Sequence, residues 1–549
     1  MDICIGKGFK SMNKQVENRR RAFEILWLMI LLIAVTRGVT LTHNMELHPD
    51  ENVFVRAAVS LKDKVMGLGD VYEEAKEYPE GAYVFQLPFH IASQIIKQLS
   101  GHTINGFVTG RIASAAYFSA AAVLGFFLLY RYMDRRYVTL LAYAATMVFS
   151  LFHIEQSRYG TGDAISIFLL VLEIVCCAAA SDGKRKVPLL LAAALISGFL
   201  AAVKYPLLFF LCIPVSVLWR LYRRKTVMKR IGLTVLLGAA ALAGFLLCSP
   251  KVVRDPLYVA RVILTESRAY LRGGNLFTLG GWYNHVASVA VYSLCYSGFP
   301  LALGLMCYAI IFRLKKRAIQ TDVDFLFHLV IPIVMLVFFI YNISIISLFM
   351  RSFYPFLFLT DLYASTAVGE LYDKGGTKLQ TVLAVLAAVM ICRGCFFLLA
   401  LSERNSGERL NRLIAAAADE NWKETSLIAT RPLSGPYLAF DPNLLRDAKE
   451  LYIQDERFLQ PDTAKLRQGE MVITGTEDYS RSNRYIIPFD SEMVHDLICN
   501  WETFQNVNEQ YLIGRPYPKY YYYLFGYWIK GTTGTDYEFP TNYVYYRSE

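Results

Sequence analysis

Long apolar runs recur along this 549-residue chain and are separated by short polar segments that are mostly basic. Residues 23–42, 231–248 and 381–401 carry few or no charges, and such runs approach or reach the roughly 20 residues that cross a bilayer as a helix. Hydrophobic residues make up 55% of the chain and aromatic residues 14%, more than a soluble domain needs to fill its core. We therefore interpret the chain as a polytopic membrane protein rather than as a large soluble helical protein.

The pattern predicts an α-helical membrane domain over residues 1–401 with about eleven transmembrane helices. The predicted spans are 23–42, 104–130, 137–152, 163–181, 188–203, 206–219, 231–249, 286–312, 325–348, 352–369 and 379–401. A signal peptide is the alternative for the first run, since Lys7, Lys10, Lys14 and Arg19–Arg21 precede it. That run is too long for the core of a signal peptide and no small-residue cleavage site follows it, so we predict a retained first span.

The basic residues predict the orientation in the cell membrane. The cations before the first span keep the N-terminus cytoplasmic, and the turns on that side should carry the excess of Lys and Arg. Such clusters occur at alternate turns: Arg131, Arg135 and Arg136; Lys184, Arg185 and Lys186; Arg220–Arg230; Arg313–Arg317; and Lys374 with Lys378. The net charge of +10 therefore reports topology and does not indicate nucleic-acid binding.

Two segments outside the spans carry structure of their own. The first outer loop, 43–103, contains amphipathic stretches near 51–65 and 83–99 that are suited to the membrane interface. After residue 401 the composition becomes that of an ordinary soluble domain, and an odd span count places residues 402–549 outside the cell. We predict a small extracytoplasmic α/β domain with helices near 407–420 and 442–452 and strands near 425–430, 470–474, 519–529 and 541–547.

The distribution of charged residues bears on the class of function. Transporters tend to place ionisable residues at mid-membrane and to show paired breaks in two repeats. Here the main charged residues within the predicted spans are Arg111, Glu173 and Arg393, and no internal repeat is visible. Acidic and basic residues gather instead at the outer ends of spans, which indicates a cavity that opens at the outer surface.

Two short acidic motifs lie at that outer level. The first, Leu47–Phe54, contains His48, Asp50 and Glu51 just beyond the first span. Its structural interpretation is a helix start, in which Pro49 opens the helix and the helix dipole favours carboxylates in the first turn. The second motif, Ser157–Asp163, contains Arg158, Tyr159 and Asp163, and its structural interpretation is the N-cap of the next helix.

Basic residues accompany these motifs at the same depth. Lys204 and Tyr205 form a tight outer turn, and Arg351 and Tyr354 belong to the segment Met350–Pro355. Lys204 by itself is explained by snorkelling to the interface. Two carboxylates together with Lys and Arg at one membrane depth indicate a site for chemistry on a lipid phosphate.

These motifs, in this order and topology, resemble the C-type (GT-C) membrane glycosyltransferases. The similar branch is that of the protein O-mannosyltransferases and the lipid A aminoarabinose transferases. The resemblance covers roughly residues 20–400 and rests on the Asp50–Glu51 pair, the long first loop, the Arg158–Tyr159…Asp163 motif and the Lys204–Tyr205 turn. Many relatives carry a Pro-Pro pair where this chain has Tyr78–Gly81, so the geometry of the first loop departs from the family.

The resemblance implies an inverting transfer of a sugar from a polyprenyl-phosphate donor to an acceptor hydroxyl at the outer face. Phosphate leaves without a proton, so one carboxylate base suffices, and we assign Asp50 to that role. Glu51 orients Asp50 or is structural, and Asp163 supports Asp50 or holds a cation or a sugar hydroxyl. Donor phosphate is assigned to Lys204, Arg158 and Arg351, and other substrate contacts to His48, Tyr159, Tyr205 and Tyr354.

The partners and alternatives follow from the same reasoning. No nucleotide-binding phosphate loop is visible, which fits a lipid-linked donor. The acceptor is a glycan, a lipid or a protein. The alternatives are a transporter of a lipid-linked or envelope component and a non-catalytic membrane scaffold. The sequence leaves open the sugar, the acceptor, the oligomeric state, the role of the C-terminal domain and the need for a divalent metal.

Overall fold

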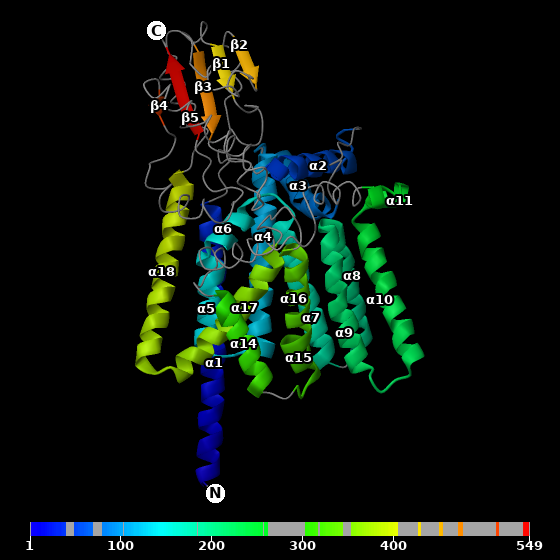
Figure 1. The fold of residues 1–549 in the computed structure, drawn as a ribbon, viewed down its shortest axis with the longest axis vertical. Helices are drawn as coiled ribbons and strands as arrows, with labels where there is room; N and C mark the ends of the chain where they lie inside the picture. Colours follow the sequence, from blue (N-terminus) through cyan, green and yellow to red (C-terminus); the bar gives the residue numbers. More distant parts are fainter. Residues whose placement is uncertain are drawn as a thin grey trace, which may run out of the picture.

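The computed structural model describes residues 2–39, 49–69, 80–102, 104–183, 185–255, 257–261, 302–316, 319–343, 353–403 and five short strands between 426 and 547. Most of these residues form a bundle of helices that stand side by side, and Figure 1 shows the N-terminus and the C-terminus at opposite ends of it. The bundle helices are α1 (Asp2–Gly38), α4 (Gly106–Leu128), α5 (Tyr137–Phe149), α6 (Leu151–Arg158), α7 (Asp163–Asp182), α8 (Lys186–Val203), α9 (Cys212–Leu221), α10 (Val227–Leu247), α14 (Ala302–Lys316), α15 (Asp322–Phe325), α16 (Ile331–Ile343), α17 (Tyr354–Lys374) and α18 (Gly376–Glu403).

Short turns of other helix types extend three of these helices. The π-helical η1 (Leu129–Met133) continues α4, the 3-10 helix η2 (Tyr205–Leu211) precedes α9, and the π-helical η3 (Leu326–Val330) joins α15 to α16. Side chains at helix starts satisfy free backbone N–H groups, as where Asn105 accepts from Phe107 at the start of α4.

Among the described residues, six helices are long and apolar enough to cross a membrane, and a seventh span results if the bent pair α5 and α6 counts as one. The six are Gly106–Met133, Asp163–Asp182, Lys186–Val203, Val227–Leu247, Asp322–Asn342 and Gly376–Phe396. Large apolar side chains such as Val235, Leu242 and Val385 lie exposed on the outside of the bundle, where lipid would cover them. The chain is therefore a multi-pass membrane protein, as the hydropathy pattern predicted.

Helix α17 belongs to the bundle although it is not one of these six apolar helices. The sequence predicts a span at 352–369, and residues Tyr354 to Gly369 of α17 are all buried among the other helices. This buried stretch includes Asp361 and several residues with hydroxyl groups. Such polar residues lower the mean hydropathy of the helix. A helix enclosed by protein can carry polar groups because its neighbours supply their hydrogen bonds. The predicted spans at 23–42, 286–312 and 325–348 are only partly within the described residues.

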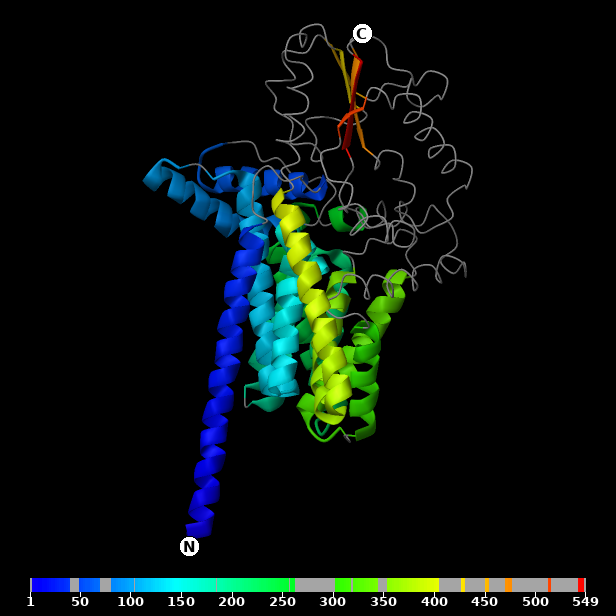
Figure 2. The ribbon, with the colours of Figure 1, turned by 90° about the vertical axis from the view of Figure 1, so that its left-hand side faces the viewer.

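Three helices lie across the end of the bundle opposite the N-terminus. They are α2 (Pro49–Val65), α3 (Gly81–Ser100) and α11 (Pro250–Arg254), and Figure 2 shows α2 and α3 at this end from the side. The amphipathic stretches predicted at 51–65 and 83–99 thus form helices. Helix α3 begins directly against α8, because a Cβ atom on Gly81 would lie 2.6 Å from the backbone of Ala202. It ends at Gly101, whose φ of 74° favours glycine.

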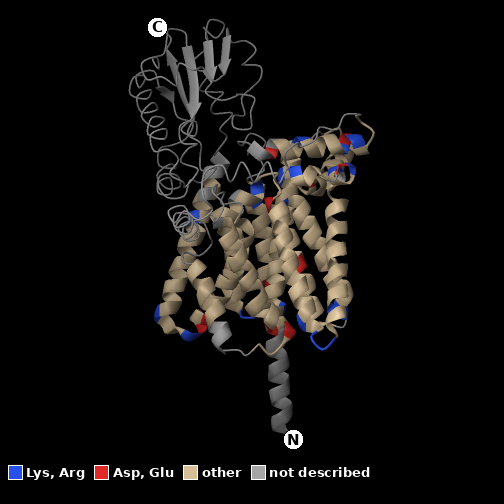
Figure 3. Cartoon of the chain, turned by 45° about the vertical axis from the view of Figure 1, so that its right-hand side comes forward, with Lys and Arg blue, Asp and Glu red and all other residues tan. Residues whose placement is uncertain are grey.

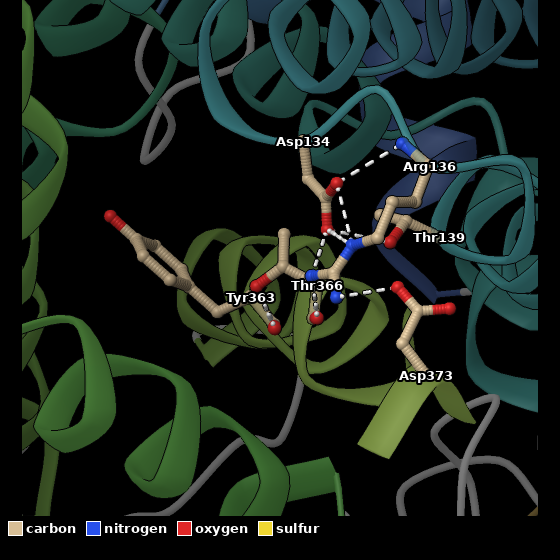
Figure 4. Close-up of polar contacts among 6 residues, drawn as sticks. All are labelled: Asp134, Arg136, Thr139, Tyr363, Thr366 and Asp373. Atoms are coloured by element: carbon tan, nitrogen blue, oxygen red, sulfur yellow. Dashed lines mark hydrogen bonds and ion pairs between the residues drawn. The ribbon is translucent and has the colours of Figure 1, made fainter. Parts of the chain in front are cut away.

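The opposite end of the bundle carries a network of ion pairs, drawn in Figure 4. Asp134 accepts hydrogen bonds from Arg136 and from Thr139 Oγ1, and Arg136 also reaches Asp373 of α17 at 3.2 Å. Arg136 also donates to the carbonyl of Thr366 at 3.3 Å, while the Thr366 hydroxyl bonds the carbonyl of Tyr363. Burial by itself raises the pKa of Asp134, but these hydrogen bonds and the Arg136 charge outweigh it and lower this pKa below its ordinary value. The turn after η1 is thereby fixed to α17.

Five described strands near the C-terminus form one mixed sheet in the order β2-β1-β3-β5-β4. Their bounds are β1 (Ser426–Ala429), β2 (Glu450–Ile453), β3 (Glu470–Gly475), β4 (Leu512–Gly514) and β5 (Asn542–Arg547). Strand β1 pairs in parallel with β2 and β3, and β5 pairs antiparallel with β3 and β4.

The sheet confirms the strands predicted at 425–430, 470–474 and 541–547. The helix predicted near 442–452 is wrong at its end, because residues 450–453 form strand β2 beside β1. Pairing with a strand far away in sequence decides this segment, and a local pattern does not contain that information. The predicted helix at 407–420 and strand at 519–529 lie outside the described residues.

Candidate active site

A buried carboxylate ties the first turn of α2 to the bundle. Glu51 is 0% exposed, and its two carboxylate oxygens accept from Arg111 of α4, with Nε to Oε1 at 2.8 Å and Nη2 to Oε2 at 3.0 Å. The same Oε1 accepts the backbone N–H of Gly160 at 2.9 Å. Gln86 of α3 donates to the carbonyl of Gly160, also at 2.9 Å. Four segments, α2, α3, α4 and the turn between α6 and α7, therefore meet at Gly160.

The meeting point favours glycine because the backbones approach one another closely. A Cβ atom on Gly160 would lie 3.1 Å from Val55 Cγ2 and 3.2 Å from the carbonyl carbon of Gly110. On Gly110 it would lie 2.8 Å from the same Val55 methyl group. Side chains at these positions would push α2 and α4 away from the turn that carries the second acidic motif.

The second acidic motif forms an ion pair with the lysine turn. Asp163, at the first position of α7, is 2% exposed and pairs with Lys204 Nζ at the end of α8. Thr161 Oγ1 donates to the other carboxylate oxygen of Asp163 at 2.8 Å. The Lys204 side chain is 29% exposed, whereas that of Asp163 is only 3% exposed. The sequence predicted the common depth of these two residues but not their contact.

Arg158 and Tyr159 lie at the end of α6, directly before this turn. Both are buried, and the guanidinium carbon of Arg158 lies 4.4 Å from the centre of the Tyr159 ring. Arg158 Nη2 also donates to the Tyr159 hydroxyl. A stacked, planar guanidinium keeps a fixed direction, which suits it to recognising an oxyanion.

The remaining predicted site residues are placed as follows. Asp50 belongs to the first turn of α2, next to Glu51, but its side chain lies outside the described part of the chain. His48 and Arg351 lie outside the described residues altogether. Tyr205 is half-buried, and its ring packs against Phe245 of α10 with centroids 6.3 Å apart. Tyr354 is fully buried at the start of α17.

The sequence analysis named Tyr354 but missed the polar residues near it inside the bundle, which are Arg37, His153 and Asp361. This cluster lies where α5 ends and α6 begins. His153 Nε2 lies 3.0 Å from Asp361 Oδ2 and His153 Nδ1 lies 3.4 Å from the Tyr354 hydroxyl. Arg37 donates to the carbonyls of Met147 and Val148 in the last turn of α5. The sequence did contain one sign of this cluster, because Arg37 and Asp361 are charged residues inside the predicted spans 23–42 and 352–369.

Among the described residues, no group of three or more His, Cys, Asp and Glu side chains is arranged to hold a metal ion. The side chains of His48 and Asp50 are outside that set.

No protein-family model matches the chain, and no curated protein matches it. Several solved structures do match the chain. The apo structure of ArnT from Cupriavidus metallidurans has a TM-score of 0.50 at 13% identity, over 84% of this chain and 94% of that one. ArnT bound to undecaprenyl phosphate has a TM-score of 0.49 at 14% identity, over 83% and 93% of the two chains. The apo oligosaccharyltransferase from Archaeoglobus fulgidus has a TM-score of 0.48 at 11% identity, over 85% and 71%.

The chain has the fold of ArnT. The likeness to the apo ArnT structure extends over 84% of this chain and nearly the whole of that protein. This is the GT-C fold that the sequence resemblance implied. At this identity the likeness concerns the fold, and the chemistry has to be argued from the residues of this chain.

Proposed function

We propose that the protein is an inverting glycosyltransferase that moves a sugar from a polyprenyl phosphate to an acceptor hydroxyl at the outer face of the membrane. The observation that carries this proposal is the convergence at Gly160. There the Glu51–Arg111 pair fixes the turn of α2 that carries Asp50, and the same loop leads into the Asp163–Lys204 pair. A basic and an acidic group thus lie together in a fold shared with ArnT, a protein that has been solved with undecaprenyl phosphate bound.

The proposed reaction needs one proton acceptor and one site for the leaving phosphate. The acceptor oxygen forms a bond to the anomeric carbon on one face while the bond to the phosphate oxygen breaks on the other. Polyprenyl phosphate leaves with the bonding electron pair, and Asp50 takes the proton of the attacking hydroxyl. Lys204, Arg158 and Arg351 stabilise the phosphate charge, and burial of Arg158 strengthens that interaction.

The other assigned residues have supporting roles in this proposal. Glu51 acts through Asp50, because its own oxygens are committed to Arg111 and Gly160. Asp163 pairs with the Lys204 ammonium group until the phosphate takes its place. His48, Tyr159, Tyr205 and Tyr354 contact the substrates.

We also propose about eleven spans, a cytoplasmic N-terminus and an extracytoplasmic domain over residues 402–549. Figure 3 shows Lys, Arg, Asp and Glu gathered near the two ends of the bundle, with the N-terminus beyond one of them. The basic turns at Arg131–Arg136, Arg220–Arg230 and Lys374–Lys378 lie at that same end, opposite α2 and α3. An excess of Lys and Arg marks the cytoplasmic side.

A cysteine introduced at Ser434 is expected to react with a membrane-impermeant maleimide in intact cells, since the proposed topology places it outside. A cysteine introduced at Thr226, in the basic turn before α10, is expected to react only after the cells are opened. Labelling is read by a mass shift on a gel. Protection at position 434 together with labelling at position 226 would reverse the proposed orientation.

The transporter alternative gains no support from the inner end of the bundle. Ion pairs there join segments far apart in sequence, namely Arg131 with Asp182, Arg136 with Asp373, and Arg220 with Asp322. A transporter would have to separate such contacts in each cycle, whereas a transferase with an outward site can keep them.

The proposed function is tested by supplying donors. Purified protein in liposomes is incubated with a panel of radiolabelled polyprenyl-phosphate sugars and a mixed acceptor extract. We expect transfer from at least one donor by the wild type and a strong reduction with Asp50→Asn. Failure of every donor, together with no binding of polyprenyl phosphate, would overturn the proposal.

Lys204→Ala is expected to weaken polyprenyl-phosphate binding by about 2 kcal/mol, or about 30-fold, because one charge-assisted contact to the phosphate is lost. Asp163→Asn is the matched comparison. It removes the partner that competes with phosphate for the same ammonium group, so it is expected not to weaken binding. Dissociation constants are measured in detergent by scintillation proximity. Equal weakening by both variants would reassign Lys204 to holding α8 against α7.

A further inference from the structure

Helix α6 is held at both of its ends by contacts to other helices. It has eight residues, fewer than a helix needs to be stable by itself, so its position depends on these contacts. Near its start, His153 reaches Asp361 of α17. Just beyond its end, Gly160 is bound by Glu51 and Gln86. Arg158 lies between the two attachments.

The contact between His153 and Asp361 is enclosed by protein and joins residues 208 positions apart. The side chains are 0% and 1% exposed, so water does not weaken the interaction. The other ring nitrogen of His153, Nδ1, lies 3.4 Å from the Tyr354 hydroxyl, so both nitrogens of the ring have a polar neighbour on α17.

The periodicity of α17 explains why both partners of His153 come from one helix. Tyr354 and Asp361 are seven residues apart, which is two turns, and therefore lie on the same face of α17. The Tyr354 ring packs edge-on against Phe152, with centroids 4.9 Å apart, and tilted against His153 at 5.7 Å. The Ser157 hydroxyl donates to the carbonyl of His153 at 2.6 Å and joins the two turns of α6.

We propose that Asp361 and His153 are positioning residues for the transfer reaction. They anchor α6 to α17, so that Arg158 at the end of α6 and the following loop, whose Asp163 pairs with Lys204, keep their place. This inference rests on the proposed function, since it assigns a role in the same site. Neither residue contacts the substrate in this scheme; both act through the position of α6.

Two substitutions at one position separate the two contacts of the imidazole ring. The amide of glutamine reaches the place of Nε2, and that of asparagine reaches only the place of Nδ1. His153→Gln therefore keeps the link to Asp361, and His153→Asn breaks it. We expect His153→Asn to lower kcat about 10–100-fold, as for a small displacement of a phosphate-binding group, and His153→Gln to retain most of the activity.

Backbone hydrogen exchange gives a readout that does not depend on activity. His153→Asn is expected to speed the exchange of amides 156–162, while those in the middle of α7 stay protected. Ser365→Ala is the matched control, because Ser365 is buried on α17 and its hydroxyl bonds the carbonyl of Asp361 on its own helix. Unchanged exchange at 156–162 in His153→Asn would overturn the anchoring role, whatever the activity of the protein.

A double-mutant cycle tests whether the effect on transfer passes through Arg158. We expect His153→Asn to lower kcat far less in an Arg158→Gln background than in the wild type. In that background the guanidinium group is already absent, so a shift of α6 can no longer displace it. Additive effects would overturn the inference while leaving the proposed function intact. Absence of transfer and of polyprenyl-phosphate binding in the wild type would instead refute the proposed function, and the exchange experiment would then decide the anchoring alone.

Discussion

Asp50→Asn is expected to lower turnover about 10²–10⁴-fold, the usual range for the loss of a general base. An acceptor hydroxyl is a poor nucleophile because its pKa lies far above that of a carboxylic acid, so attack is slow unless a base takes the proton during the step. Asparagine keeps the size of the side chain and much of its hydrogen bonding but cannot accept that proton. Donor binding is expected to survive, since the phosphate contacts come from other residues.

The structure sharpens this expectation by fixing the backbone around Asp50. Its neighbour Glu51 is locked to Arg111 and to Gly160, so the first turn of α2 cannot move away from the Asp163–Lys204 pair without breaking buried contacts. Asp50→Asn therefore removes the proton-accepting carboxylate while the first turn of α2 keeps its position. Turnover and melting temperature are measured on the same preparation.

Asp63→Asn is the matched control, because Asp63 lies on the same helix, α2, and pairs with Lys62 away from this turn. We expect it to leave turnover unchanged. If Asp50 serves only the helix dipole, Asp50→Asn would cost about 0.3–1 kcal/mol of stability with activity retained. Near-wild-type transfer would make Asp50 structural, and Asp163 would be the next candidate for the base.

Glu51→Gln is expected to reduce stability by about 3–5 kcal/mol, because a neutral amide replaces the buried carboxylate that pairs with the Arg111 charge. Both side chains are at most 2% exposed, so solvent does not compensate the loss. Glutamine has almost the same shape as glutamate, which keeps the packing of α2 on α4. The measurement is unfolding by titration with a denaturing detergent, followed through intrinsic tryptophan fluorescence.

Two further variants distinguish a buried charge from a general packing defect. Glu51→Leu combined with Arg111→Met removes both charges together and is expected to recover much of the lost stability. Arg131→Ala breaks the pair with Asp182, whose side chains are 50% and 45% exposed, and is expected to cost at most about 1 kcal/mol. A loss below about 1 kcal/mol for Glu51→Gln would show that Arg111 finds other partners and that the pair does not hold α2.

The class of protein and several of its elements could be predicted from the sequence because their causes are local. An apolar run of sufficient length becomes a transmembrane helix whatever its neighbours are, since the bilayer leaves its backbone groups no other partner. The helices at 51–65 and 83–99 were likewise predicted, because the spacing of apolar residues along a short stretch of sequence reveals an amphipathic helix. The short acidic and basic motifs and their common depth followed from the order of the spans.

The contacts that make a site depend on how distant helices pack, and no local pattern contains them. Glu51 finds its partner 60 residues away in Arg111, Asp163 finds Lys204 41 residues away, and His153 finds Asp361 208 residues away. The hydropathy pattern treated α17 as one span among many, whereas packing encloses it and makes Asp361 an internal partner. The sequence by itself determined that the chain is a multi-pass helical membrane protein and where six of its apolar helices lie. Only the tertiary structure decided which charges meet, because an ion pair in an enclosed bundle forms where the packing of several helices brings its two side chains together.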